Sequence, residues 1–278
     1  MTVALLRGAE LLEALEPGGG QADEARMARS PHDRAKPGTP SRHALDLGIH
    51  RQPDDTTCGP TCLQAVYRYF GDEIALDDVI AEVRQLAGGG TLAVSLANHA
   101  LRRGYGALIY TYNLTVFDPS WFEGKSPELA ERLGAQARAK QDPKLAEATE
   151  AYLEFLRLGG RLAMEDLTPG LLRRWLKRDR PVLTGLSATF LYRTAREVGE
   201  ETLEEDDVRG VSTGHFVVFC GWDAEERSVC VADPLEDNPR SQERIYWLPV
   251  DRVINAILLG VLTYDANLLV LEPPEGTP

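Results

Sequence analysis

The two halves of the chain carry different secondary-structure patterns, and this asymmetry sets the strongest limit on the fold. Up to about residue 180, apolar residues recur mainly at helical spacing, whereas the rest is rich in short strands such as "GHFVVFCGWD", "SVCVADP", "ERIYWLP" and "NLLVLEP". The regular alternation of strands and helices that is typical of doubly wound sheets is missing. Helices followed by strands predict an α+β fold, with an N-terminal helical half and a C-terminal antiparallel sheet.

The first helix of the folded region has a clear apolar stripe. Leu63, Val66, Tyr67 and Phe70 follow the spacing i, i+3, i+4 and i+7, and Gly71 supplies a stop. The same reasoning predicts further helices over residues 77–86, 92–104, 126–158 and 167–180, and a strand over 106–113. The segment 126–158 breaks at an Asp-Pro pair and therefore predicts a helical hairpin, inserted at about 118–165.

Composition divides the chain into one domain and two short tails. Residues 1–45 contain "EPGGGQADEARMARSPHDRAKPGTPSRH", which is rich in Gly, Pro and charge and buries too little apolar area to offset the entropy of ordering. We predict a flexible tail over 1–45, one domain over 46–272 and a second tail over 273–278. The 278 residues, of which 43% are hydrophobic, suffice for a sizeable core.

Charge and hydropathy exclude several classes of function. The net charge of −13 argues against binding to the phosphate backbone of a nucleic acid. The longest apolar run, "INAILLGVL", has about half of the ~20 residues that a membrane-spanning helix needs. The N-terminal residues lack the basic start and cleavage signal of a secretory leader. These features predict a cytoplasmic protein with four reduced cysteines.

One of these cysteines stands at the entrance of the first helix. Cys58 follows a polar loop in which Asp55, Thr56 and Thr57 are possible caps, and Pro60 occupies the first turn, where a missing N–H costs nothing. The positive end of the helix dipole would point at the thiol and favour its thiolate form. Cys58 is therefore the candidate nucleophile.

The candidate base and its partner lie on a predicted β-hairpin. His215 opens the strand "HFVVFCGW", and "RSVCVADP" is the returning strand. Symmetry about the turn predicts that Phe219 faces Val229 and that His215 faces Asp233 on the same face. A carboxylate beside an imidazole fixes the ring tautomer and stabilises the imidazolium, so these two residues predict the base and orienter of a catalytic triad.

Two further sets of polar residues need separate interpretations. Gln52, six residues before Cys58, would place an amide N–H next to the backbone N–H of Cys58, and the two groups predict an oxyanion hole. Other thiols and imidazoles sit within apolar helical or strand patterns and are interpreted as packing residues: Cys62, His99, Cys220 and Cys230.

Together these motifs resemble a known enzyme family. Gln52, then "TCGPTC" at a helix start, and "GHFVVFCGWD" with "VADP" far downstream resemble the bacteriocin-processing cysteine peptidases that cut double-glycine leaders, family thirty-nine of the cysteine peptidases in the papain-like superfamily. The resemblance covers roughly residues 48–112 and 168–272. It implies a papain-like fold and a Cys-His-Asp triad of Cys58, His215 and Asp233, with Gln52 in the oxyanion hole. The chemistry that this resemblance implies requires neither a metal nor an organic cofactor.

The chemistry that these residues predict is hydrolysis of a peptide or amide bond through a thioester acyl-enzyme. Two alternatives remain open at this point. The same acyl-enzyme could pass to an amine, as in a transpeptidase or acyltransferase, or the domain could be a catalytically silent peptide-binding module. The acidic segment 197–207, which precedes the histidine, is a candidate lid that would favour amines or basic peptides.

Overall fold

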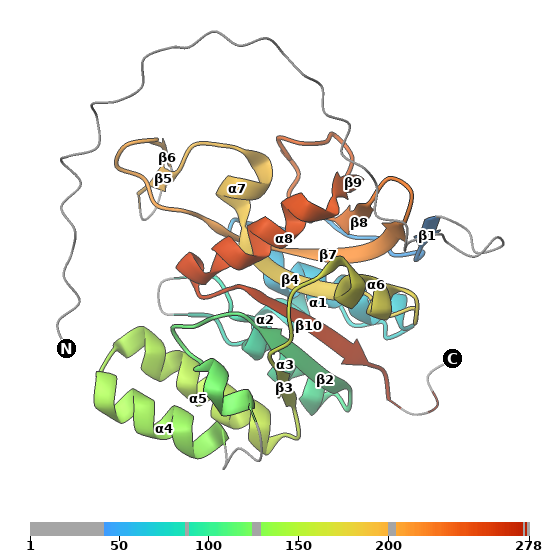
Figure 1. Ribbon diagram of the computed structural model, residues 1–278. Helices are drawn as coiled ribbons and strands as arrows, with labels where there is room; N and C mark the ends of the chain where they lie inside the picture. Colours follow the sequence, from blue (N-terminus) through green and yellow to red (C-terminus); the bar gives the residue numbers. More distant parts are fainter. Residues whose placement is uncertain (1–41, 87–88, 124–128, 200–203, 275, 277–278) are drawn as a thin grey trace, which may run out of the picture. The chain divides into compact units, whose positions relative to one another are not determined.

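A mixed sheet of eight strands organises the part of the chain that the structure describes (Figure 1). The structure is a computed structural model, and it describes residues 42–86, 89–123, 129–199, 204–274 and 276. Seven strands follow the order β3-β2-β10-β4-β7-β8-β9, and β1 pairs with β7. Their bounds are β1 Arg42–Ala44, β2 Gly106–Thr111, β3 Arg161–Ala163, β4 Val182–Ser187, β7 Gly214–Asp223, β8 Ser228–Ala232, β9 Ile245–Pro249 and β10 Asn267–Glu272.

The helices cover the two faces of this sheet. Their bounds are α1 Cys58–Tyr69, α2 Leu76–Glu82, α3 Ala93–Arg102, α4 Leu129–Lys140, α5 Pro143–Arg157, α6 Pro169–Leu176, α7 Ala188–Tyr192 and α8 Val250–Leu259. Two short 3₁₀ helices span Pro119–Phe122 and Gly260–Thr263. Side chains from α1 to α5 form one core cluster with the sheet, and side chains from α6, α7 and α8 form another. The predicted α+β class is therefore confirmed.

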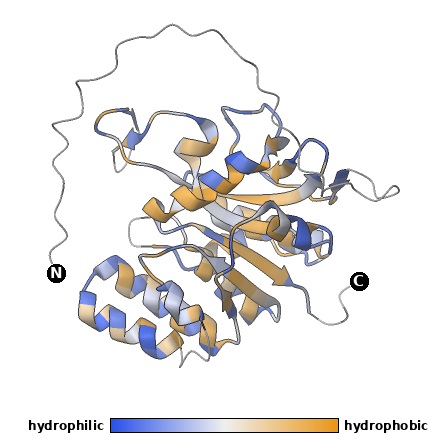
Figure 2. Cartoon of the chain, viewed as in Figure 1, coloured by the Kyte–Doolittle hydropathy of each residue, from blue (hydrophilic) through white to orange (hydrophobic). Residues whose placement is uncertain are grey.

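Alternation along the strands explains why there are two clusters. Phe216 and Val218 of β7 belong to the first, whereas Val217 and Phe219 belong to the second, as expected when neighbouring side chains point to opposite faces. The central strands are hydrophobic along most of their length in Figure 2, because helices cover them on both sides. The catalytic candidates lie where α1 meets β7 in this buried centre.

The sheet differs from the prediction in two respects. It is not confined to the C-terminal half, because β2 pairs with the last strand, β10. It is not purely antiparallel either, because β2 and β3 pair in parallel. A parallel pair needs a long crossover connection, and here that connection carries α4 and α5, the predicted helical hairpin.

The tails and the acidic segment fall partly outside the described residues. Residues 1–41, 200–203, 275 and 277–278 are among those that the structure does not describe. Arg42–Ala44, which we assigned to the tail, pair with β7 and so belong to the folded unit. Around the acidic segment, β5 (Glu197–Val198) and β6 (Glu204–Glu205) form a two-stranded antiparallel sheet. No helix within the described ranges is long and apolar enough to cross a membrane.

Candidate active site

Helix α1 begins at Cys58, as the sequence predicts. The helix is buried from Cys58 to Tyr67 because it packs between β7, α2 and α3. Cys58 is the most accessible of the four cysteines, with 9% of its surface exposed, against 0% for Cys62, 1% for Cys220 and 3% for Cys230. The thiol at the helix start is therefore the one that a ligand can reach.

The predicted caps of α1 do not cap it. Thr57 occupies the N-cap position, but its side chain makes no capping hydrogen bond. Its hydroxyl donates instead to the carbonyl of Asp54 at 3.2 Å, and the Asp54 carboxylate accepts the backbone N–H and the hydroxyl of Thr56. The loop residues bond to one another, and the N-cap side chain of α1 leaves the backbone N–H groups at the helix start uncapped.

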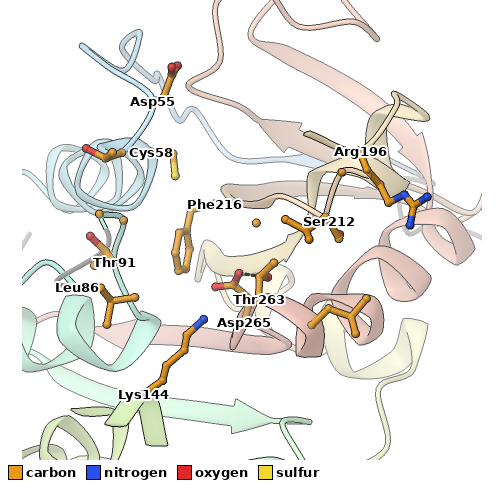
Figure 3. A pocket seen from close by; sticks show the side chains of 17 residues that line it. Asp55, Cys58, Leu86, Thr91, Lys144, Arg196, Ser212, Phe216, Thr263 and Asp265 are labelled. Carbon is orange, nitrogen blue, oxygen red and sulfur yellow. Dashed lines mark hydrogen bonds between the residues drawn. The ribbon is translucent and has the colours of Figure 1, made fainter. Parts of the chain in front are cut away.

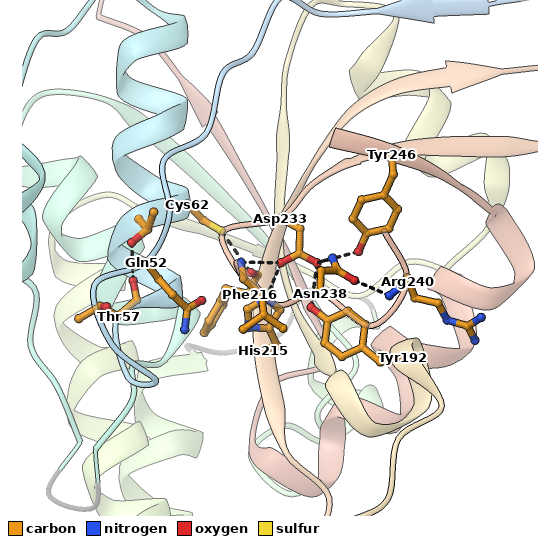
Figure 4. A network of polar contacts seen from close by, with 12 residues as sticks. Gln52, Thr57, Cys62, Tyr192, His215, Phe216, Asp233, Asn238, Arg240 and Tyr246 are labelled. Atoms are coloured by element: carbon orange, nitrogen blue, oxygen red, sulfur yellow. Dashed lines mark hydrogen bonds and ion pairs between the residues drawn. The ribbon is translucent and has the colours of Figure 1, made fainter. Parts of the chain in front are cut away.

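A second thiol fixes α1 against β7. One turn below Cys58, the Cys62 Sγ donates to the carbonyl of Phe216 at 3.2 Å (Figure 4). Gly59 also leaves room for this contact, because a Cβ there would lie 3.3 Å from the Phe216 ring. Cys62 is a packed thiol as predicted, and it holds the residue after His215 on the helix that carries Cys58.

The hairpin of β7 and β8 has a different register from the predicted one. Phe219 pairs with Val231, not with Val229, and a bulge between Phe219 and Gly221 shifts the remaining pairs. His215 consequently does not stand directly opposite Asp233. Next to the turn the observed pairs, such as Asp223 with Ser228, are shifted by three residues from the predicted register, because β7 continues to Asp223. The extra residue of the bulge on β7 reduces this shift to two residues at the His215 end.

The structure nevertheless joins the two side chains. His215 Nε2 lies 2.9 Å from Asp233 Oδ1, and the two residues are 6% and 0% exposed. A shift of two residues keeps a side chain on the same face, so the pair meets diagonally instead of directly. With Nε2 bonded to the carboxylate, Nδ1 is the ring nitrogen that remains for another partner.

Cys58 and Asp233 both act on the pKa of this ring. Burial lowers the pKa of His215, but the charge and hydrogen bond of Asp233, together with hydrogen bonding and charge interaction with Cys58, raise it to about 10. Burial also opposes ionisation of Asp233, yet its contacts with His215 outweigh this effect and lower the Asp233 pKa. The arrangement favours an imidazolium between a thiol and a carboxylate.

Five donors converge on the Asp233 carboxylate, and the sequence revealed only one of them. Oδ1 accepts from His215 Nε2 and from the backbone N–H of Leu235 at 3.0 Å. Oδ2 accepts from three side chains at 2.7–2.9 Å: Tyr192, Asn238 and Tyr246 (Figure 4). Tyr192 also stacks near His215, with ring centroids 6.0 Å apart. These donors keep the carboxylate charged and fixed in a dry environment.

Gln52 lies in the same region as the thiol and the acid. It is 7% exposed, its backbone N–H donates to the carbonyl of Pro234 at 3.0 Å, and its Nε2 donates to the carbonyl of Asp54 at 2.9 Å. The first bond ties the Cys58 loop to the residue after Asp233. The second uses one of the two amide hydrogens, so one hydrogen remains for an acceptor in the site.

A cavity opens directly beside Cys58 (Figure 3). Its volume is about 740 Å³, and both Phe216 and the backbone of Gly214 line it next to His215. Four ionisable side chains other than cysteine face it: Asp55, Lys144, Arg196 and Asp265. None of these four was among the predicted site residues, and Asp265 reaches the cavity only through the turn after α8.

The histidine and the cysteines that we interpreted as packing residues lie in buried positions. His99 Nδ1 lies 2.8 Å from the Tyr67 hydroxyl, and its Nε2 lies 3.0 Å from Glu82, which agrees with a packing role. Cys220 and Cys230 are buried on the adjacent strands β7 and β8, as expected. Among the described residues, no group of three or more His, Cys, Asp and Glu side chains is placed to hold a metal ion.

Comparison with known proteins finds similarity to solved structures only. No protein-family model and no curated protein matches the sequence. Among solved structures, a Bacillus anthracis protein described as a C39-like peptidase has a TM-score of 0.46 and 15% identity, with 84% of this chain and 99% of that chain covered. The double glycine motif protease of an AMS/PCAT transporter, solved with its leader peptide, has a TM-score of 0.40 and 12% identity, with coverages of 83% and 94%.

A third similar structure is xylellain, a cysteine protease from Xylella fastidiosa. Its TM-score is 0.40 and its identity is 14%, with 84% of this chain and 86% of that chain covered. Because the identities are 12–15% and the TM-scores lie below 0.5, these structures carry no activity over to this chain, and its function has to be inferred from its own residues.

Proposed function

We propose that this chain is a cysteine peptidase or amidase in which Cys58 is the nucleophile, His215 the base and Asp233 the orienting acid. The observation that supports this most is the contact of 2.9 Å between His215 Nε2 and Asp233 Oδ1, on a ring whose pKa both Asp233 and Cys58 raise. A buried imidazole with these two partners is the arrangement that activates a thiol for attack on a carbonyl.

The proposed reaction begins with proton transfer from Cys58 to Nδ1 of His215. The thiolate then attacks the carbonyl carbon, a C–S bond forms, and the carbonyl electrons move to the oxygen. The remaining N–H of Gln52 and the backbone N–H of Cys58 stabilise this oxyanion. Collapse of the intermediate breaks the C–N bond, and His215 donates its proton to the leaving amine.

In deacylation His215 acts as a base, whereas it acts as an acid toward the leaving amine. Neutral His215 takes a proton from a water molecule, and the hydroxide attacks the thioester carbonyl. The acid product leaves, and the Cys58 thiolate and the imidazolium are restored. Asp233 stays ionised throughout and holds the ring in position through Nε2. Each of the four predicted site residues thus has its own role in the proposed reaction. The proposed substrate is a peptide or an amide. The cytoplasmic location stays a prediction from the sequence.

Thiol labelling tests the proposal before any substrate is known. We expect iodoacetamide to label only Cys58 at about pH 6, because the other cysteines are 0–3% exposed and lack an imidazolium. His215→Ala should slow this labelling by about 10- to 100-fold at that pH, since the thiolate loses its counter-ion. Intact mass and peptide mapping from about pH 4 to about pH 9 measure both effects.

The outcomes of this experiment separate the alternatives. Slow labelling that is shared among the cysteines and unchanged in His215→Ala would reject an activated thiol and favour a silent peptide-binding module. Selective labelling would support the active site, and a screen with peptides and added amines would then distinguish water from an amine as the acceptor. A product with a new amide bond would identify acyl transfer.

Gln52 offers an independent test of the oxyanion hole. We expect Gln52→Ala to lower kcat by about 10²- to 10³-fold because one donor to the transition state is lost. Gln52→Glu should lower kcat similarly, since an ionised carboxylate cannot donate. Iodoacetamide labelling of Cys58 should stay within about 3-fold of the wild type in both variants, because alkylation forms no oxyanion. Equal losses of labelling and turnover would show that Gln52 acts only on the loop structure.

A further inference from the structure

Asp265 is a buried carboxyl group in the cavity beside Cys58, outside the proposed triad. It is 5% exposed, and it lines the cavity together with Cys58, Gly214 and Phe216. Its Oδ2 accepts from the hydroxyl of Thr263 at 2.6 Å. Within the described ranges, no Lys, Arg or His forms an ion pair with this carboxyl group. Among these residues, an ionised Asp265 therefore has no ion-pair partner in direct contact.

Two glycines make room for this carboxyl group. A Cβ at Gly185 of β4 would lie 2.5 Å from Asp265 Oδ1, and a Cβ at Gly214 of β7 would lie 2.5 Å from Oδ2. Any side chain at either position would displace the carboxyl group. The first residue of β7, directly before the proposed base, therefore needs to be glycine for Asp265 to reach the cavity.

The backbone around Asp265 is strained. Tyr264 and Ala266, on either side of it, both adopt left-handed conformations, with φ of 68° and 58°. Non-glycine residues with such φ values are uncommon, and they cluster where function fixes a side chain in one place. The turn after α8 thus holds Asp265 between two residues in a sparsely populated conformation.

The charge of the surroundings indicates what the carboxyl group would bind. Asp55 stands on the opposite rim of the cavity, and the exposed acidic residues Glu204 and Glu205 belong to the two-stranded sheet next to Arg196. Arg196, a cation on the same cavity, donates to the carbonyl of Asp207 and keeps its charge. The full chain carries a net charge of −13. The long-range field of this net charge attracts cations to the protein and repels anions.

Two nearby cationic groups have the opposite preference. The charge of His215 lowers the Asp265 pKa, and so does the charge of Lys144. Lys144 reaches the cavity from the first turn of α5, and its ammonium lies over the Tyr264 ring at 4.5 Å from the centroid. Figure 3 shows its ammonium end directed toward Asp265 and Thr263. It forms no ion pair with Asp265 in the described chain, but its charge lowers the Asp265 pKa. Lys144 therefore competes with any cation that approaches the carboxyl group.

We propose that Asp265 is the specificity residue of the cavity and binds a cationic group of the substrate, an ammonium or guanidinium, while Cys58 attacks a nearby carbonyl. This subsite rests on the proposed peptidase function and narrows its substrate to basic peptides or amides. A bound cation would give Asp265 an ion-pair partner. Burial raises the pKa of the Asp265 carboxyl group to about 7, and a bound cation would favour the ionised form of this group.

Binding measurements on an inactive variant test this subsite. On full-length Cys58→Ala, we would measure the affinities of peptide sets in which one position at a time is lysine or its neutral isostere norleucine. We expect lysine to bind about 10- to 100-fold more tightly at one position. Adding Asp265→Asn should reduce this preference to about 2-fold and leave the norleucine affinity unchanged. Adding Lys144→Met should increase the preference, because a competing cation is removed.

Matched controls and opposite outcomes keep the test decisive. Asp55→Asn removes a carboxylate from the exposed rim of the same cavity and should change the preference by less than about 3-fold. A lysine preference that survives Asp265→Asn, in a variant with an unchanged Tm, would overturn the proposal. So would a glutamate preference over glutamine that Lys144→Met abolishes, because Lys144 would then be the binding group.

The failure of this proposal and the failure of the proposed function are distinguishable. If the wild type hydrolyses peptides but Asp265→Asn leaves the lysine-to-norleucine ratio of kcat/KM unchanged, only the subsite is wrong. If no peptide is turned over but the binding preference depends on Asp265, the subsite holds and the chemistry does not.

Discussion

Cys58→Ala should abolish peptide or amide turnover and leave a correctly folded protein. The expected loss in kcat is on the order of 10⁴- to 10⁶-fold, because no other group in the site can form the acyl-enzyme. Intact mass after acid quenching should show an acyl adduct on the wild type and none on the variant. Removal of a 9% exposed side chain at the start of α1 should change Tm by only a few degrees.

Cys62 provides the matched control on the same helix. Cys62→Ser keeps a hydroxyl donor for the Phe216 carbonyl and should lower kcat by less than about 10-fold. Turnover that persists in Cys58→Ala, or that is lost equally in Cys62→Ser, would contradict the assignment of Cys58 as the nucleophile.

Asp233→Asn should have the second largest effect. We expect kcat/KM to fall by about 10²- to 10⁴-fold, because the imidazolium loses its carboxylate and the ring loses its fixed orientation. The substitution also places an amide where Tyr192, Asn238 and Tyr246 all donate to Oδ2. At least one donor will lack an acceptor or the amide will rotate away from His215, and either result disturbs the base.

The pH profile identifies the reason for this loss. In the wild type the His215 pKa is raised to about 10, so the charged ring is present at neutral pH, and the activity and stability that depend on it are lost as the pH rises through that value. Without the carboxylate, burial dominates and lowers the His215 pKa. The alkaline limb of kcat/KM should therefore move to lower pH in Asp233→Asn. An unchanged alkaline limb would contradict the proposed pairing.

A second buried acid on β7 serves as the control for this variant. Asp223 is 8% exposed, lies at the other end of the strand and accepts the backbone N–H groups of Glu225 and Glu226 in the hairpin turn. Asp223→Asn should lower the stability of the fold, because the hairpin turn loses the carboxylate that accepts its N–H groups. The pH profile should stay unchanged, and kcat should stay within about 3-fold of the wild type.

The sequence was sufficient for features that depend on local pattern. The apolar spacing of Leu63, Val66, Tyr67 and Phe70 predicted α1 correctly, because these side chains form the face that packs on the rest of the core. The Asp-Pro pair at residues 142–143 likewise marked the start of α5, where Asp142 caps the helix.

The hairpin shows how a correct contact can follow from an incorrect register. The direct pairing of Phe219 with Val229 was wrong, but the error of two residues kept His215 and Asp233 on one face. An error of one residue would have placed them on opposite faces. The contact between His215 and Asp233 was therefore predicted correctly because the register error preserved strand parity. The sequence did not show the bulge or the place of the turn.

The residues that the sequence did not reveal depend on tertiary structure. Tyr192 and Tyr246 are separated by a long stretch of chain and meet only at the Asp233 carboxylate. Asp265 reaches the cavity through a strained turn that follows α8. No spacing in the sequence predicts these contacts, because α7, β9 and the turn before β10 take their positions by packing on the completed sheet.

The place of β10 in the sheet has a consequence for the protein during its synthesis. This last strand lies between β2, on the side of the helical half, and β4, which pairs with the strand of His215. A ribosome-bound chain that has not yet released residues 267–272 already contains both the proposed nucleophile and the proposed base, but it lacks the strand that joins their supporting sheet segments. On the proposed function, the growing polypeptide would stay proteolytically silent until β10 has paired with both β2 and β4.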